Sequence, residues 1–234
     1  MSWLSVRLVV VALAGLLLVG FSIPRMAAYA IVAPLGHVRE ALDQGMPIEE
    51  NRLVEAYEKL SAALAWLPRE ADLQQDRARA ARRLAGFSGE PNSAKVTAQD
   101  AVMDLRTAVA VAPSRSFLWA LLADSEIAAG ASPASVYEYL HMSWLTGPHK
   151  LSAMRIRSRI VLAHWPEMPL DIQNRALADI SIIWASPAFR GELIALYLDA
   201  GFAARAAIRE EMSRTDGRLE QFDRVLRMQV APAG

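Results

Sequence analysis

Residues 114–148 read SRSFLWALLADSEIAAGASPASVYEYLHMSWLTGP and contain two apolar segments on either side of Gly130-Ala-Ser-Pro133. Apolar side chains in each segment recur every three or four residues, which is the spacing of one buried helix face. Glycine and proline between the segments end one helix and begin the next. A connection this short predicts two antiparallel helices that pack together.

The same organisation extends over most of the chain. No sustained alternating run rich in β-branched residues is present that would predict a sheet, so the expected fold class is all-α. Breaks rich in glycine and proline separate the helical segments. Helices are predicted at residues 47–67, 69–85, 93–112, 116–129, 133–145, 149–163, 169–184, 187–199, 203–214 and 216–228.

Three of these segments share a pattern of small residues, leucine and proline. Each copy has members four, seven and twelve residues after its first residue, and the copies start 45 and then 35 residues apart. The three copies are Ala56, Leu60, Ala63 and Pro68; Ala101, Leu105, Ala108 and Pro113; and Val136, Leu140, Ser143 and Pro148.

This spacing resembles the second helix of a tetratricopeptide repeat, in which small residues allow close helix pairing and a proline bounds the exit. Trp119, Leu122 and Ala123 stand where the family places Trp, Leu and a small residue in its first helix. Glu126 replaces the usual aromatic residue, and the 45-residue step implies an insertion around residues 86–92. The resemblance implies a stack of antiparallel helix pairs; an unrelated all-α bundle is the alternative.

The segment Leu8–Ile23 contains no charged residue. With Trp3 and Leu4 it reaches about the 20 residues that a bilayer requires, which predicts one transmembrane helix. A cleavable signal peptide is the rival interpretation, because Ala28-Tyr29-Ala30 satisfies the small-x-small rule for cleavage. The third interpretation is a buried helix of a soluble protein. The predicted division is therefore an anchor or signal peptide with its linker at 1–35, and a helical repeat-like domain at 36–234.

The predicted location is a bacterial inner membrane. The amino terminus and Arg7 outnumber Arg25 beyond the apolar segment, so the positive-inside rule favours a single-pass protein with its bulk in the periplasm. The opposite orientation stays open. Cleavage would release the protein into the periplasm.

Composition argues against several functional classes. The 25 basic and 25 acidic residues balance, which argues against nucleic acid as a partner. There is no cysteine, and no two of the four histidines are three or four residues apart, so no metal or cofactor is expected. Neither a nucleophile elbow nor a phosphate-binding glycine loop occurs. We therefore expect no enzyme; a glycan-acting enzyme would need Glu126 to converge with Asp124 or Glu138.

Two groups of residues are candidate interaction surfaces. Arg79 and Arg82 belong to an arginine-rich stretch, read either as a salt-bridged exterior or as a contact with acidic lipids or an anionic glycan. Tyr137 and Tyr139 are two residues apart on a predicted helix, so both cannot face the core, and one of them is a candidate for surface contact.

A second resemblance concerns Ser143-Trp-Leu-Thr-Gly-Pro148, which precedes an arginine-rich helix and Trp165-Pro. This stretch is similar to small helical proteins associated with bacterial envelope polysaccharide production. The expected function is a membrane-anchored adaptor for protein partners in an envelope assembly, with exopolysaccharide biosynthesis or export as the implied process. The alternative is an accessory subunit that stabilises an integral membrane complex through its own transmembrane helix.

Overall fold

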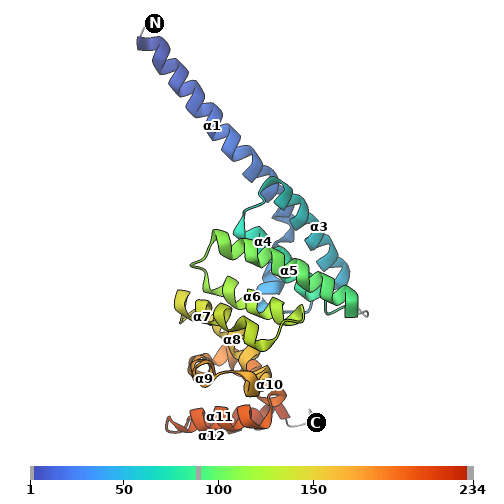
Figure 1. Ribbon diagram of the computed structural model, residues 1–234, viewed down its shortest axis with the longest axis vertical. Helices are drawn as coiled ribbons and strands as arrows, with labels where there is room; N and C mark the ends of the chain where they lie inside the picture. Colours follow the sequence, from blue (N-terminus) through green and yellow to red (C-terminus); the bar gives the residue numbers. More distant parts are fainter. Residues whose placement is uncertain (1–2, 88–90, 231–234) are drawn as a thin grey trace. The chain divides into compact units, whose positions relative to one another are not determined.

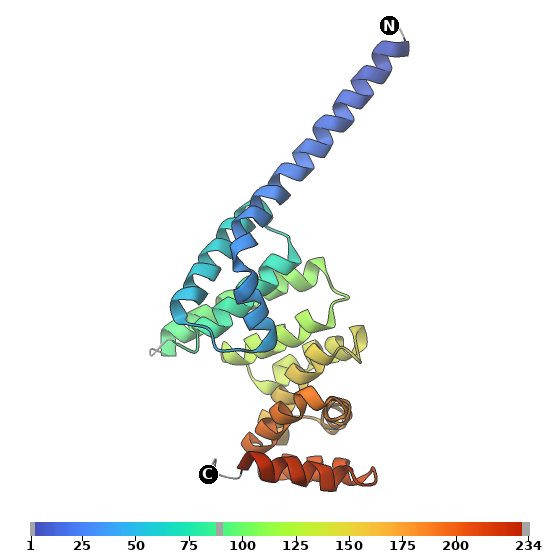
Figure 2. The ribbon, with the colours of Figure 1, turned by 180° about the vertical axis from the view of Figure 1, so that it is seen from behind.

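The computed structural model describes residues 3–87 and 91–230, and every regular element within these ranges is helical. This confirms the predicted all-α class. The chain divides into two compact units, Met1–Ala112 and Pro113–Gly234. The division falls inside the range 36–234 that the sequence analysis treats as one domain. Figures 1 and 2 show the elements of each unit.

The first unit is built around a core of small and branched apolar side chains. Buried residues include Leu53, Leu60 and Leu73, each at most 1% exposed. Short connections return the chain after each helix, so that α3 packs against both α1 and α4, and α4 packs against α5. Its elements are α1 (Trp3–Val32), the 3-10 helix η1 (Ala33–Leu35), α2 (Gly36–Gln44), α3 (Glu50–Trp66), α4 (Ala71–Leu84) and α5 (Pro91–Val111).

Helix α1 confirms the prediction of a long apolar helix at the N-terminus, but it is longer than the predicted span. The predicted span ends at Ile23, whereas α1 continues through Pro24 to Val32. Ala28 and Val32 are 0% and 2% exposed and belong to the core of the first unit. Burial of these two residues explains why the helix persists past the proline.

Helix α2 was not predicted. Val38 and Leu42 are spaced as i and i+4 and are both buried, which gives this short helix one apolar face. Gly45 ends the helix with φ at 72°, a left-handed conformation that glycine adopts without steric strain.

The second unit has a larger core, which includes Trp184 and Phe222 with their rings 5.2 Å apart. Helix α6 packs on α7 and α8, α8 packs on α9 and α10, and α10 packs on α11 and α12. Its elements are α6 (Ser116–Ala128), η2 (Pro133–Val136), α7 (Tyr137–Thr146), α8 (Leu151–Ala163), η3 (Trp165–Glu167), α9 (Leu170–Ala185), η4 (Pro187–Phe189), α10 (Arg190–Asp199), α11 (Phe202–Ser213) and α12 (Arg218–Val230).

The first three residues of each copy of the pattern lie in α3, in α5, and at the junction of η2 with α7, where Val136 is the last residue of η2. The first three members of every copy are at most 1% exposed, and the closing prolines Pro68, Pro113 and Pro148 are exposed just after each helix. Leu122 is 1% exposed, and the half-buried Trp119 donates its indole N–H to the Pro113 carbonyl at 2.7 Å. The buried members are Ala56, Leu60, Ala63, Ala101, Leu105, Ala108, Val136, Leu140 and Ser143.

Candidate membrane anchor and polar sites

From position 10 to Ile23, the residues of the apolar part of α1 are exposed. Leu16, Leu17 and Leu18 are 75%, 62% and 68% exposed. By length and composition α1 is a helix able to cross a membrane. A core helix of a soluble protein buries such residues, whereas none of the described residues covers this stretch.

The arginine-rich helix α4 is tied to its neighbours by ion pairs. Arg77 donates from Nε to Asp104 Oδ2 of α5 at 2.8 Å, and Arg39 of α2 pairs with Asp76. Hydrogen bonding to Asp104 raises the pKa of Arg77, whereas burial raises the pKa of Asp104 against the opposing effect of Arg77. These two ion pairs link α4 to α2 and to α5.

The candidate surface residues Arg79 and Arg82 lie on this same helix. The Arg79 side chain is only 11% exposed, and its guanidinium pairs with Asp43. Arg82 is half-buried. Of the two interpretations left open for this stretch, the structure favours the salt-bridged one at Arg79.

Tyr137 and Tyr139 are both half-buried and pack against the core of the second unit. The Tyr137 hydroxyl donates to the Glu167 carbonyl. The Tyr139 ring stacks on Trp119, with centroids 6.2 Å apart and planes at 23°. Each ring therefore has a packing partner within the unit.

A buried polar network joins α7, α8 and α9. Arg157 is 0% exposed, and its Nε donates to Asp179 Oδ2 at 2.8 Å. Its other nitrogens donate to the carbonyls of Ser143, Gly147 and Pro148 at the end of α7, at 3.0–3.3 Å. Arg157 thus caps the carboxyl end of one helix while pairing with a carboxylate on another.

Asp179 completes the network. It is 3% exposed and accepts the indole N–H of Trp144 at 3.0 Å in addition to the bonds from Arg157. Burial raises the pKa of the Asp179 carboxyl, and the hydrogen bonds and charge of Arg157 oppose that rise. Sequence reasoning missed this network, although Arg157 shares the helical spacing of the buried Ala153 and Ile160.

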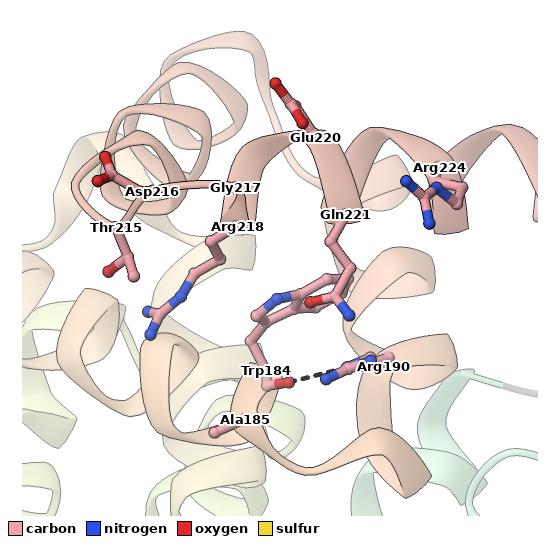
Figure 3. A pocket seen from close by; sticks show the side chains of 10 residues that line it. All are labelled: Trp184, Ala185, Arg190, Thr215, Asp216, Gly217, Arg218, Glu220, Gln221 and Arg224. Carbon is pink, nitrogen blue, oxygen red and sulfur yellow. Dashed lines mark hydrogen bonds between the residues drawn. The ribbon is translucent and has the colours of Figure 1, made fainter.

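The second unit also has an open polar pocket of about 470 Å³ between α9, α10 and α12. Arg190 donates to the Trp184 carbonyl at 3.0 Å and covers its ring at 5.0 Å, and Arg218 donates to Ser181. Figure 3 shows Glu220 directed away from Trp184. The lining residues are Trp184, Ala185, Arg190, Thr215, Asp216, Gly217, Arg218, Glu220, Gln221 and Arg224.

The charges of this pocket are unbalanced. Within the described ranges, Arg190, Arg218 and Arg224 have no ion-pair partner, as is also true of the half-buried Arg205, whereas Arg77 and Arg155 are paired with carboxylates. The buried indole N–H of Trp184 also has no acceptor among these residues. The lining also includes the carboxylates Asp216 and Glu220, so the three arginines leave a small excess of positive charge. Together with the free indole donor, this excess suits a carboxylate or another anionic group.

The candidate catalytic carboxylates do not line this pocket. Asp124 pairs with Arg159 at 2.8 Å, Glu126 is half-buried on the same helix α6, and Glu138 is exposed on α7. In the described part of the chain, no group of three or more His, Asp or Glu side chains is arranged to hold a metal ion.

Comparison with known proteins gives no family assignment: no protein-family model matches the chain, and no curated protein matches it significantly.

Proposed function

We propose that this chain is a membrane-anchored helical-repeat adaptor that organises a protein partner in a bacterial envelope assembly. The observation that carries the proposal is the exposed apolar stretch of α1, continuous with turns of the same helix that belong to the core of the first unit. An apolar helix surface of this length requires a cover, and a bilayer is matched to it in thickness.

The order of packing supports the repeat part of the proposal. In the second unit, α6, α8 and α10 pack in succession, and α7, α9 and α11 each accompany one of them. The repeated small and leucine positions are buried alike in α3, α5 and α7. Stacked helix pairs of this kind provide an extended binding surface that needs no reactive residue.

The pocket around Trp184 is the surface that we assign to the partner. Arg190, Arg218 and Arg224, which have no ion-pair partner in the part of the chain that the structure describes, suit an acidic segment of a protein, because a guanidinium binds a carboxylate through two parallel hydrogen bonds. Exopolysaccharide biosynthesis or export is the process that the resemblance at Ser143–Pro148 suggests.

The proposed location is the inner membrane, with a single crossing and the bulk of the chain in the periplasm, as the positive charges near the N-terminus favour. Retention of the N-terminal segment agrees with the burial of Ala28. Cleavage after Ala30 would remove Ala28 from the core of the first unit.

A second candidate function is an accessory subunit that stabilises an integral membrane complex through α1 itself. Gly15 and Gly20 are small exposed residues on this helix, since a Cβ added at either would meet nothing within 4 Å, but they are five residues apart and miss the Gly-x3-Gly spacing. Small exposed residues on an apolar helix allow close approach of a neighbouring transmembrane helix.

Co-purification from detergent-solubilised membranes separates the two functions. One variant replaces Leu8–Ile23 with an unrelated apolar span, and the other carries Arg190→Glu and Arg218→Glu. An adaptor keeps its partner with the foreign span and loses it with the pocket variant; an accessory subunit behaves in the opposite way. Arg205→Glu, at another half-buried arginine without an ion pair within the described ranges, is the matched control. A chain that elutes alone from its native membranes would refute both functions.

A further inference from the structure

The point where α1 leaves the first unit lies close to the end of its exposed apolar stretch. Ile23 is 55% exposed and Ala28 is 0% exposed, and the helix is unbroken between them. Five residues of α-helix rise about 7.5 Å. A head-group layer is about 5–8 Å thick on each side of the hydrocarbon. Whatever packs against Ala28 therefore lies at the depth of the head groups when the apolar stretch spans the bilayer.

The neighbouring element at this point is the end of α3 with its turn into α4. Figures 1 and 2 both show the carboxyl end of α3 beside α1 where α1 emerges from the unit. Helices α1 and α3 pack against each other, which places the end of α3 near this part of α1. In agreement, burial and then the negative charges of Glu70 and Asp72, at the start of α4, raise the pKa of Tyr29 in α1.

Three side chains in this region are available to a partner. Trp66, the last residue of α3, is 50% exposed. Arg25 and Arg69 are exposed, and neither has an ion-pair partner in the described part of the chain. Arg39 and Arg77 of the same unit are both paired with buried aspartates.

This combination matches the chemistry of a membrane surface. Tryptophan is enriched at the boundary between hydrocarbon and water, where its ring and its N–H meet different environments. Guanidinium groups bind phosphate through paired hydrogen bonds. The nearby carboxylates, Glu70 and Asp72, are half-buried, and Asp72 already has a partner.

We infer that Arg25, Trp66 and Arg69 form a second membrane contact, in which the α3–α4 turn of the first unit sits in the head-group layer and binds anionic phospholipid. The inference rests on the proposed membrane anchor. It adds that the first unit lies against the bilayer surface, at an orientation fixed by the continuous helix α1.

Single-cysteine spin labelling of the full chain tests this directly, because the sequence contains no cysteine. Labels are placed at Leu17 in the apolar stretch, at Pro68 in the α3–α4 turn, and at Met46 before the other end of α3. The protein is reconstituted into vesicles of phosphatidylcholine, with or without phosphatidylglycerol. Collision with oxygen reports lipid, and collision with a water-soluble nickel chelate reports solvent.

The expected result is that the nickel chelate collides several-fold less often with the label at Pro68 than with the label at Met46, with the larger difference in the anionic vesicles. Trp66→Ala combined with Arg69→Gln raises collisions at Pro68 toward the value at Met46. Arg52→Gln, an exposed arginine at the start of α3, leaves them unchanged.

Two results would overturn the inference while leaving the anchor intact, with the label at Leu17 still in lipid. In one, the labels at Pro68 and Met46 are equally open to the nickel chelate in both kinds of vesicle. In the other, protection at Pro68 increases with the ratio of protein to lipid, which means that a second copy covers the turn. A label at Leu17 as open to nickel as that at Met46 would instead refute the anchor.

Discussion

Replacing Arg157 with methionine should destabilise the second unit strongly. The substitution leaves the buried carboxylate of Asp179 with the indole N–H of Trp144 as its remaining donor in the network. It also removes the donor from the carbonyls of Ser143, Gly147 and Pro148 at the end of α7. Loss of one partner of a buried ion pair costs about 3–5 kcal/mol. A small domain is stable by about 5–15 kcal/mol in total, so we expect the loss of about a fifth or more of its stability.

A double-mutant cycle turns this prediction into a test of the network. Asp179→Leu should cost less than Arg157→Met, because Arg157 keeps its three carbonyl acceptors. The double variant removes both buried charges, so its loss of stability should be smaller than the sum of the two single losses, by about 0.5–3 kcal/mol.

The assay is denaturant unfolding of the full chain in detergent, followed by tryptophan fluorescence. This signal reports chiefly on the second unit, because four of the six tryptophans lie there. Unchanged dependence of the unfolding free energy on denaturant would show that compactness is preserved. A loss below about 1 kcal/mol for Arg157→Met, the range of exposed pairs, or strict additivity in the cycle, would refute the role assigned to Arg157.

Three further outcomes follow from other parts of the structure. Gly147→Ala places a methyl group 2.7 Å from the Cβ of Ser116 in α6. We therefore expect the free energy of unfolding to fall by about 1–3 kcal/mol in the same assay. The hydrogen bond from Arg209 lowers the pKa of Asp223. The pair therefore stabilises the fold fully above the ordinary aspartate pKa of 3.8, and this stability is lost as the pH falls through the lower pKa of the folded state. Asp223→Asn should abolish this part of the acid dependence of the unfolding midpoint. Deletion of residues 1–30 removes Ala28 from the core of the first unit. Thermal unfolding followed by circular dichroism should then show a transition at a lower temperature than in the full chain. An unchanged transition temperature would contradict the packing of α1.

The positions of the helices follow closely from local sequence. The predicted helices at 116–129 and 169–184 compare with α6 at Ser116–Ala128 and α9 at Leu170–Ala185. Apolar spacing and proline are short-range signals, so one sequence is enough to read them. Helix α2 was missed because its buried face has only Val38 and Leu42, too few positions to establish a period.

The polar sites were harder to predict, because they depend on contacts between distant helices. For the arginine-rich stretch that contains Arg77 and Arg79, the sequence predicts either a salt-bridged exterior or a contact with acidic lipids or an anionic glycan. In the structure α4 packs against α2 and α5, so that Arg77 meets Asp104 of α5 and Arg79 meets Asp43 of α2. Which carboxylate lies opposite each arginine is a property of the packing and not of the local pattern.

Arg157 was predictable in part. It lies four residues after Ala153 and three before Ile160, both buried, so its position on the apolar face of α8 was readable from the spacing. A charge on such a face requires a partner of opposite charge. Its partner Asp179 lies on α9, and no rule of spacing within one helix identifies it.

Pro24 lies where α1 passes from its exposed apolar stretch to the turns packed in the first unit. A proline has no N–H, so the Gly20 carbonyl lacks its helical hydrogen bond. In the middle of a bilayer that loss is expensive. Gly20 is about 4.5 Å from Ile23 along the axis, close enough to the proposed boundary for water or head groups to supply a donor. The helix therefore remains continuous across this boundary, so a rotation of the transmembrane part of α1 about its axis rotates the first unit by the same angle. One residue inserted between Ile23 and Ala28 would rotate the unit by about 100°, and would turn Trp66 and Arg69 away from the lipid.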